Sequence, residues 1–462
     1  MIADAVAAVR ASVPSYQERL ASLVSIAGIS AKSFPASEVR RSADAVAETL
    51  IEDGMDNVRL LETALHPAVY GELVVGETAP TILVYGHHDV QPAFREERWL
   101  SPPFEAVVRD GRIFGRGTSD DKGGCIAYLA AVRACAATGA LPCNVKLLIE
   151  GEEEIGSPNL EALLAEHRSL FTSDFIVLCD TPNFATGIPS LVYRLRGNCL
   201  VDVEVSCLAR PVHSGQAGGL APDAVMILCG LLAGLRDGIP GLNERVHVDD
   251  AQLAAMRALP FDADRFKHDF AFLDGVETIE ATPSWEHIWA RPSLAITAIE
   301  AIPMANASNQ IADSARARIS LRTVRDLGSA EAGELVANAI RSRTPRGVHV
   351  TATVLGGPSW WEADPSHPVF AAARRALRNG FGAEPVMAGS GGSIGFVKPF
   401  ADLAPDVPPL LTGVQDPHSN AHSENESLHL GDWEKAMVSG VHLFPELASS
   451  AAGGRRGSGV GG

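Results

Sequence analysis

Two features that would place a protein at a membrane are missing from this 462-residue sequence. No apolar run reaches the roughly 20 residues that a membrane-spanning helix needs. The first thirty residues carry Asp4, Arg10, Glu18 and Arg19 and have no apolar core of a signal peptide. An excess of positive charge is missing too, because the formal net charge is −18. We therefore expect neither a membrane nor nucleic acid as a partner, since both carry negative charge.

The cysteine pattern excludes two further classes of protein. The seven cysteines are an odd number, are scattered from Cys125 to Cys229, and include no CxxC pair. They indicate neither a disulfide framework nor a CxxC metal site, and reduced thiols in the cytoplasm fit best. A phosphate-binding GxxxxGK[ST] loop is absent as well.

What the sequence does have is two kinds of strand pattern. Apolar runs at 81–85, 145–149 and 175–179 are typical of strands that are buried on both faces of a sheet. The segments 199–205 and 315–322 alternate apolar and polar residues, which is typical of antiparallel strands with one solvated face. The hydrophobic fraction of 46% and the length suit a globular protein with more than one domain.

These patterns predict an α/β fold with an insertion. We expect a first domain over residues 1–195 and 354–450, with a mixed, mostly parallel sheet and helices on both of its faces. An inserted α+β domain with an antiparallel sheet is expected over residues 196–353. The Gly-rich tail at 451–462 is predicted to be disordered.

Metal-capable side chains follow three of the apolar runs. They are His87 with Asp89, Glu153 with Glu154, and Asp180. In open α/β sheets, ligands bind at the carboxyl ends of strands. Each motif alone also fits a solvated turn, or acidic residues at a helix N-terminus. Coincidence is a poor explanation for all three strand ends together.

Two further candidates lie in loops. Asp120 is in a Gly-rich loop before an expected helix, and His422 follows a short apolar strand. Together the candidates offer nitrogen and oxygen ligands without sulfur, which suits Zn²⁺ and also Mn²⁺ or Co²⁺. Two histidines and three carboxylates can hold two ions if one carboxylate bridges them.

The motifs resemble those of a known family. The segments GHHDVQP, GRGTSDDKGG, EGEEEIGS, PVHSGQAGG, GGSIG and NAHSENE stand in the order in which the dinuclear-zinc metallopeptidases carry them. That family includes carnosinase-like dipeptidases, acetylornithine deacetylase, succinyl-diaminopimelate desuccinylase and glutamate carboxypeptidase, and the carnosinase-like branch is the most similar. The resemblance covers nearly the whole chain. It implies that the first domain is catalytic and that the insert is a lid and dimerisation domain.

The resemblance implies a metal site of five residues. Asp120 is expected to bridge two metal ions, which are expected to be zinc. His87 and Asp180 would complete one site, and Glu154 and His422 the other. The family also implies a cis peptide bond after Asp120.

Catalytic and substrate-binding roles are implied in the same way. Asp89 would orient the neighbouring metal-ligand histidine, and Glu153 would be the general base toward the attacking water. His213 would polarise the scissile carbonyl from the partner subunit of a homodimer that forms through the lid. The residues expected at the substrate are Arg322, which would bind its carboxylate, and Asn309 and Ser393.

Two positions depart from the dipeptidase pattern. Leu355 and Ser390 stand where that branch often has a histidine and an acid. We expect metal-dependent hydrolysis of a dipeptide or small peptide with a free C-terminal carboxylate, and an N-acyl or N-carbamoyl amino acid is the alternative substrate. A catalytically silent metal-binding protein is a third hypothesis. Glu153 argues against it, because a mere binder needs the ligands but not the base.

Overall fold

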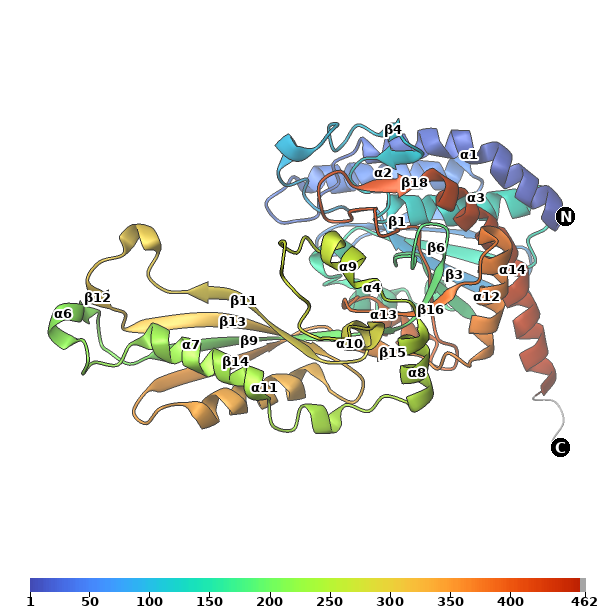
Figure 1. Ribbon diagram of the computed structural model, residues 1–462. Coiled ribbons are helices and arrows are strands. Elements are labelled where there is room, and N and C mark those ends of the chain that lie inside the picture. Colours follow the sequence, from blue (N-terminus) through green and yellow to red (C-terminus); the bar gives the residue numbers. More distant parts are fainter. Residues whose placement is uncertain (458–462) are drawn as a thin grey trace. The chain divides into compact units, whose positions relative to one another are not determined.

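The computed structural model describes residues 1–457 of the chain (Figure 1). These residues divide into two compact units. The first unit contains Met1–Tyr193, Ala363–Ala388 and the chain from Gly395 onward, and the second contains Arg194–Glu362 and Gly389–Ile394. The insertion predicted over residues 196–353 lies inside the second unit.

The first unit is built on a mixed sheet. Its strand order is β1-β2-β6-β3-β7-β17-β8-β15, where β15 is Trp361–Glu362, and β16 also pairs with β8. The strands are β1 (Asp56–Leu61), β2 (Ala68–Leu73), β3 (Thr81–His87), β6 (Asn144–Glu150), β7 (Phe175–Leu178), β8 (Ser190–Leu195), β16 (Val386–Ser390) and β17 (Leu410–Leu411). The strands β6, β3, β7 and β17 run parallel, and antiparallel neighbours flank them on both sides. The predicted mixed α/β sheet is confirmed, with parallel pairing at its centre.

Helices cover both faces of β3. The ring of Tyr85 lies 4.7 Å from the ring of Phe400 in α13 (Val397–Leu403). Successive residues of a strand point to opposite faces. Gly86 accordingly points toward Cys125 in α3 (Lys122–Ala137). The predicted arrangement, with helices on both faces, is therefore confirmed at the central strand.

The C-terminal helix of the first unit extends into the segment predicted to be disordered. The remaining helices of this unit are α1 (Ile2–Val24), α2 (Ala36–Glu52), α4 (Leu160–Glu166), α5 (Arg168–Phe171), α12 (Pro368–Phe381) and α14 (Leu430–Gly457). The segment after Ser450 opens with two alanines, which favour a helix, and α14 continues to Gly457. The rest of the predicted tail, 458–462, lies outside the described residues.

A small sheet brings two distant loops together. Its strand order is β18-β5-β4. The strands are β4 (Val107–Arg109), β5 (Arg112–Phe114) and β18 (Ser427–His429). Beside it, the backbone N–H of Gly115 donates to the carbonyl oxygen of Glu426 over 3.0 Å. The Gly-rich loop before α3 therefore lies against the NAHSENE loop.

The second unit contains an antiparallel sheet in the order β11-β13-β9-β14. The strands are β9 (Gly197–Ser206), β11 (Ser293–Glu300), β13 (Ser314–Thr323) and β14 (His349–Gly356). Buried side chains alternate with more exposed ones along β9, as the sequence pattern predicts. Val201, Val203 and Val205 form a core with the helices α7 (Ala224–Gly234) and α11 (Ser329–Arg343). The other elements are α6 (Ser214–Ala217), α8 (Asp250–Ala258), α9 (Ala263–Asp269), α10 (Trp285–Trp289), β10 (Val212–His213), β12 (Gln310–Ile311) and β15 (Trp361–Glu362).

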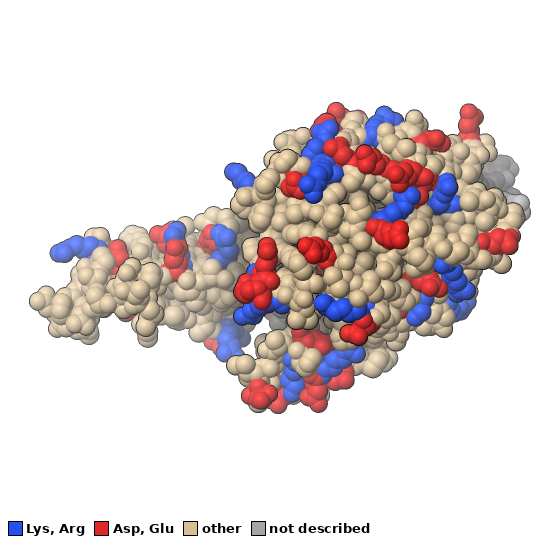
Figure 2. All heavy atoms as spheres, turned by 90° about the horizontal axis from the view of Figure 1, so that it is seen from above, with Lys and Arg blue, Asp and Glu red and all other residues tan. Residues whose placement is uncertain are grey.

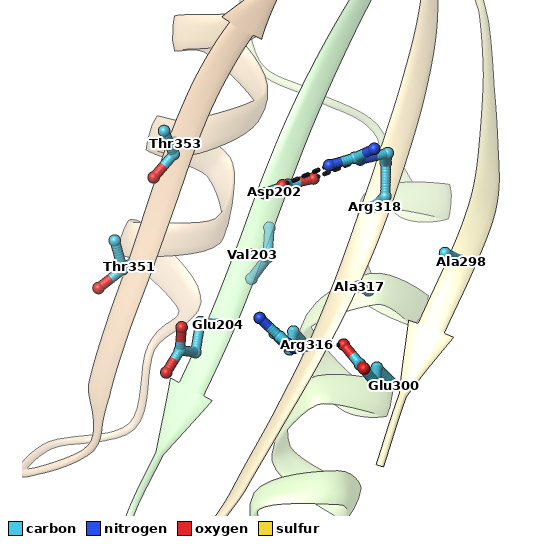
Figure 3. Close-up of a pocket in the computed structure, with 10 residues that line it drawn as sticks. All are labelled: Asp202, Val203, Glu204, Ala298, Glu300, Arg316, Ala317, Arg318, Thr351 and Thr353. Atoms are coloured by element: carbon cyan, nitrogen blue, oxygen red, sulfur yellow. Dashed lines mark hydrogen bonds and ion pairs between the residues drawn. The ribbon is translucent and has the colours of Figure 1, made fainter. Parts of the chain in front are cut away.

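The other face of this sheet carries charged pairs (Figure 3). Arg318 donates from Nε and Nη2 to the two oxygens of Asp202, over 2.7 and 2.8 Å. Arg316 forms an ion pair with Glu300 on the neighbouring strand, at 2.6 Å. All four side chains are at least 40% exposed. They are solvated strand charges, and such pairs contribute little to stability.

The chain enters and leaves the second unit through adjacent strands. In the pairing of β8 with β15, Leu195 lies opposite Trp361 and Arg194 opposite Glu362. One residue further out, the backbone N–H of Ala363 donates to the carbonyl oxygen of Tyr193 over 2.8 Å. The two ends of this segment are therefore one strand spacing apart.

Acidic and basic side chains are interspersed on the face of the molecule seen in Figure 2. Within residues 1–457, none of the helices combines the length and the apolar character that crossing a membrane requires.

Candidate metal centre

Five side chains of the first unit form two groups that share Asp120. In one group, His87 Nε2 lies 3.1 Å from Asp120 Oδ1 and 3.7 Å from Asp180 Oδ2. In the other, His422 Nε2 lies 2.9 Å from Asp120 Oδ2 and 3.1 Å from Glu154 Oε2. Each oxygen of Asp120 therefore faces a different histidine. The structure brings together all five residues that the sequence analysis named as metal ligands.

The sheet explains why these side chains meet. His87 is the last residue of β3, Asp180 follows β7, and Glu154 lies in the turn after β6. The three strands are parallel neighbours, so their carboxyl ends lie at the same edge of the sheet. Asp120 comes from the loop before α3, and His422 from the loop between β17 and β18.

The carboxylates of the centre are buried and repel one another. Burial, together with the charges of Glu154 and Asp120 and against the opposing effect of His87, raises the pKa of Glu153 to about 8. Burial, followed by the charge of Asp120, also raises the pKa of Asp180 well above its ordinary value. In the described part of the chain, histidines are the ion-pair partners of Asp120, Glu154 and Asp180.

Such crowding of buried carboxylates is unfavourable without a cation. The donor atoms are imidazole nitrogens and carboxylate oxygens, which suit divalent ions such as Zn²⁺. The residues present therefore fit a pair of divalent metal ions, one for each group.

Asp89 supports both groups. Its side-chain oxygens accept hydrogen bonds from the backbone N–H groups of Glu153, over 3.2 Å, and of Glu154, over 3.0 Å. Its Oδ1 also lies 3.4 Å from His87 Nδ1. Asp89 is fully buried, so these contacts are well shielded from water. Its position beside His87 is the one that the sequence analysis expected for a residue that orients this histidine.

Glu426, which no sequence pattern singled out, organises the loop that carries Asp120. The carboxylate of Glu426 accepts hydrogen bonds from the backbone N–H groups of Gly117, Ser119 and Asp120, over 2.9, 3.0 and 3.1 Å. It also accepts from Nη1 of Arg116 over 2.7 Å, and both side chains are buried. The NAHSENE motif contains this residue, but a sequence pattern does not tell which of its acids is turned inward.

Two glutamines were missed as well. Gln91 donates from Nε2 to Glu154 Oε2 over 2.9 Å and to the Glu154 backbone oxygen over 3.0 Å. Gln415 donates from Nε2 to Asp180 Oδ1 over 3.2 Å. Each holds a carboxylate of the centre in one orientation, which is a common role of residues behind a metal ligand. Gln91 lies within the GHHDVQP motif, whereas no motif indicates Gln415.

The remaining expected site residues lie in the second unit and form two pairs. Arg322 donates from Nη1 to Ser393 Oγ over 2.9 Å. His213 lies on β10, and the backbone N–H of the next residue donates to the carbonyl oxygen of Asn309 over 2.8 Å. Ser393 belongs to the second unit although it is distant from the rest of that unit in the sequence.

The peptide bond between Asp120 and Asp121 is cis. This confirms the expectation that the sequence analysis drew from the resemblance.

Comparison with known proteins identifies the family. The family model described as Peptidase family M20/M25/M40 matches residues 83–449, so the chain belongs to this family. The membership predicted from the motifs is confirmed, and the chain is a hydrolase of a peptidase family.

Its relatives include named dipeptidases. The chain is 33% identical over 390 residues to the cysteinylglycine-S-conjugate dipeptidase of Corynebacterium striatum, which covers 82% of this chain and 85% of that protein. It is 30% identical over 401 residues to the Beta-Ala-His dipeptidase of Homo sapiens, covering 83% of this chain and 78% of that protein. The crystal structure of human carnosine dipeptidase 1 superposes with a TM-score of 0.81 at 27% identity, covering 97% of this chain and 99% of that one.

Proposed function

We propose that this protein hydrolyses the peptide bond of a dipeptide or small peptide that has a free C-terminal carboxylate. The observation that carries the proposal is the pair of histidine–carboxylate groups that share Asp120. The similarity to proteins named as dipeptidases supports the substrate class.

Two divalent ions would be held by the five side chains of these groups. His87 and Asp180 would hold one ion and Glu154 and His422 the other, with one oxygen of Asp120 directed to each. When bound, the ions would lower the pKa of a water molecule and polarise the substrate carbonyl. Zinc suits this set of nitrogen and oxygen donors, and Mn²⁺ or Co²⁺ are the alternatives.

Glu153 would be the general base. It is the neighbour of Glu154, and no ion pair of Glu153 occurs in the described chain, so its carboxylate is available for proton transfer. Burial raises its pKa to about 8, which makes its carboxylate a stronger proton acceptor than an exposed glutamate. Glu153 would take a proton from the attacking water as the new carbon–oxygen bond forms. It would then give this proton to the amine nitrogen as the carbon–nitrogen bond breaks.

Residues of the second unit would bind the substrate. The guanidinium of Arg322 would hold the C-terminal carboxylate, and Ser393, which already accepts a hydrogen bond from it, and Asn309 would line the pocket. His213 would polarise the scissile carbonyl in the site of a neighbouring protomer. A homodimer formed through the second unit is part of this proposal.

An N-acyl or N-carbamoyl amino acid is the second candidate substrate. Ser390 favours it, because its hydroxyl accepts a hydrogen bond from the backbone N–H of Gly392 over 3.1 Å and offers no charge to a substrate ammonium. Leu355 is 49% exposed and likewise offers no charge. A panel of dipeptides and a panel of N-acyl amino acids, tested with the zinc- and manganese-loaded protein, would separate the two candidates.

The experiment that tests the mechanism compares two neighbouring carboxylates. Glu153→Gln should abolish turnover while both ions stay bound, because the amide cannot accept the proton. Glu154→Ala should instead lose an ion. Metal content by mass spectrometry and kcat on an active substrate give the two readouts. A Glu153→Gln protein that keeps near wild-type kcat would show that the assigned base is wrong.

A further inference from the structure

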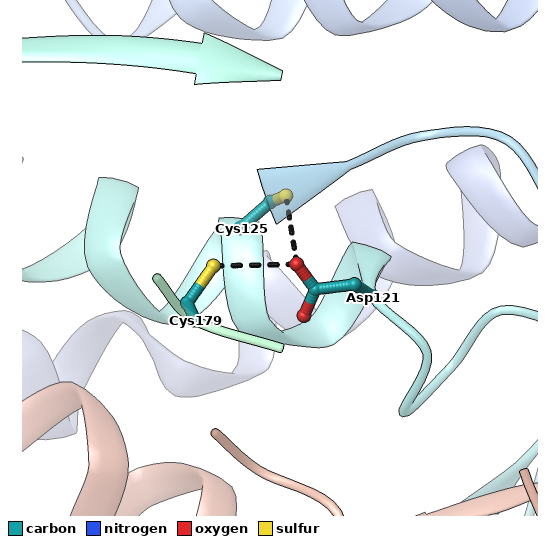
Figure 4. Close-up of side chains that lie close together, drawn as sticks. All are labelled: Asp121, Cys125 and Cys179. Carbon is teal, nitrogen blue, oxygen red and sulfur yellow. Dashed lines mark hydrogen bonds between the residues drawn. The ribbon is translucent and has the colours of Figure 1, made fainter. Parts of the chain in front are cut away.

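Next to the shared Asp120, a second aspartate faces two thiols (Figure 4). The sulfur atom of Cys179 lies 3.3 Å from Asp121 Oδ2, and that of Cys125 lies 3.6 Å from the same oxygen. Asp121 directly precedes α3, Cys125 lies in the first turn of that helix, and Cys179 directly follows β7. The three ligand atoms lie within 4.8 Å of one another.

The three side chains converge beside the α-carbon of Gly86, where a larger residue would not fit. A Cβ atom added to Gly86 of β3 would lie 2.5 Å from Cys125 Sγ and 2.8 Å from Cys179 Sγ, and it would also clash with Asp121 Oδ2. Any side chain at residue 86 would therefore fill the space between the two sulfur atoms. The absence of a side chain keeps these three polar groups facing one another.

Asp121 is a buried carboxyl group without an ion-pair partner in the part of the chain that the structure describes. Its side chain is fully buried; Oδ2 faces the two thiols, and Oδ1 has no hydrogen-bond partner within the described residues. A buried carboxyl group with an unsatisfied oxygen is costly, and a structure that retains one needs a reason for it. A cation beside Oδ2 and the two sulfur atoms would compensate the charge of this group.

The donor atoms indicate which cation would bind. A set of two sulfur atoms and one carboxylate oxygen favours soft ions such as Zn²⁺ and Cd²⁺ over Mg²⁺ and Ca²⁺. One zinc ion lies about 2.3 Å from a sulfur ligand and about 2.1 Å from an oxygen ligand, so it bridges a sulfur and an oxygen separated by up to about 4.4 Å. The separations of 3.3 and 3.6 Å fall inside that span.

We propose that Asp121, Cys125 and Cys179 form a further cation site, which takes a soft divalent ion. It shares no side chain with the two histidine–carboxylate groups, and its thiols distinguish it chemically from both. It is nevertheless joined to them through the chain, because Asp121 follows Asp120 and Cys179 precedes Asp180. The proposal stands independently of any hydrolytic activity.

Cadmium titration of the manganese-loaded protein tests the proposal. Manganese prefers the oxygen and nitrogen ligands of the other groups, and the ultraviolet charge-transfer band of cadmium reports only bonds to sulfur. We expect the band to grow with added cadmium and to level off at one ion per chain. Cys125→Ser and Cys179→Ser should each lose at least half of the band, and the double variant should lose all of it.

Two other cysteines provide matched controls. Cys143 is buried outside the cluster and Cys229 is exposed, so Cys143→Ser and Cys229→Ser should keep the full band. A wild-type protein without the band, or a double variant that retains it, would overturn the proposal.

Wild-type crystals soaked in cadmium provide a measurement that does not depend on the folding of a variant. An anomalous scattering peak between the two sulfur atoms supports the site. Peaks confined to the histidine–carboxylate groups would refute it.

Discussion

Arg322 is a half-buried cation that contacts a neutral side chain, Ser393, in the second unit. Its Nη1 donates to the hydroxyl of Ser393, and no ion pair of Arg322 occurs in the described residues. Burial lowers its pKa, which reflects the cost of keeping this charge away from water. A carboxylate could accept two parallel hydrogen bonds from such a guanidinium, which would fix both distance and angle.

We therefore expect Arg322→Ala to reduce kcat/KM by a factor that corresponds to about 2–4 kcal/mol. The kcat/KM for substrates with a free C-terminal carboxylate should fall by this amount. C-terminally amidated analogues should be poor substrates of the wild type. Arg318→Ala is a matched control, because Arg318 lies on the same strand but is exposed and paired with Asp202. Equal cleavage of amidated and free-acid substrates by the wild type would rule out the carboxylate clamp.

His88 is a buried histidine that the mechanism does not use. Its ring is fully buried, and Nε2 lies 3.0 Å from the carbonyl oxygen of Pro67. Burial lowers the pKa of His88 to about 4. The unfolded state, with a pKa of about 6.5, therefore binds more protons than the folded state between these two values. The stability contributed by neutral His88 is complete above pH 6.5 and is lost as the pH falls toward 4.

The loss amounts to about 3 kcal/mol over that range. His88→Gln removes the titrating group, so the free energy of unfolding of the wild type should fall more steeply with acid than that of the variant. Urea unfolding at several pH values, in the presence of a chelator, measures this difference. His268→Gln changes an exposed ring and should follow the wild type. Parallel pH profiles of His88→Gln and wild type would contradict the expectation.

The five expected metal ligands could be named from the sequence because each follows a strand or lies in a recognisable motif. Glu426 could not be assigned a role in this way. Glu426 is separated from Asp120 by 306 positions. Its carboxylate reaches the backbone N–H of Asp120 only once the two loops are packed together. Gln415 is a similar case, because its amide reaches Asp180 across 235 positions.

At the scale of elements, the loop before α3 depends on a single carboxylate from the other end of the chain. Glu426 accepts hydrogen bonds from three backbone N–H groups of this loop and neutralises the buried Arg116. The substitution Glu426→Gln keeps the shape of the side chain but removes its negative charge. The free energy of unfolding should fall by about 2–4 kcal/mol, because a buried guanidinium is left without its counter-charge.

The affinity for zinc should fall as well, by about 10–100-fold, because Asp120 loses its fixed position. Competition with a chromophoric chelator measures this affinity. Glu424→Gln is the control, since Glu424 lies in the same loop and forms its ion pair with the exposed Arg95. If both variants bind zinc as the wild type does, Glu426 does not position the loop.

Element types were predicted more successfully than their arrangement. Apolar and alternating runs indicated β3, β7, β9 and β13, because burial on one or two faces leaves a local pattern. The antiparallel strands that flank the central sheet leave no such signal, since strand direction depends on the connections. The helix α14 continues to Gly457, where disorder was expected. The composition of the tail alone gives no sign that a preceding helix extends into it.

At the scale of the whole molecule, the proposed homodimer can be tested by complementation. Glu153→Ala and His213→Ala should each be inactive. Mixed protomers should recover about a quarter of the wild-type activity after free exchange, since half of the dimers are hybrids with one complete site. Glu153→Ala mixed with His87→Ala is the control, because both changes lie in the first unit and cannot complement. No recovery after verified exchange of subunits would contradict a site shared between protomers.

The cytoplasmic location stays a prediction, as do the lid role of the second unit and the limits of the domains. They rest on the sequence and on the resemblance to the family.

The adjacent entry and exit strands of the second unit have a consequence for the order of folding. The central sheet needs β17, which is separated in sequence from its partner β7 by the whole of the second unit. Closing a flexible loop of about 170 residues would cost on the order of 4–5 kcal/mol in entropy. A second unit that folds first removes this cost, because the pairing of Arg194–Leu195 with Trp361–Glu362 sets Tyr193 beside Ala363. The histidines at 87 and 422 come from opposite sides of that gap, so the metal centre would be assembled late, after the inserted unit has folded.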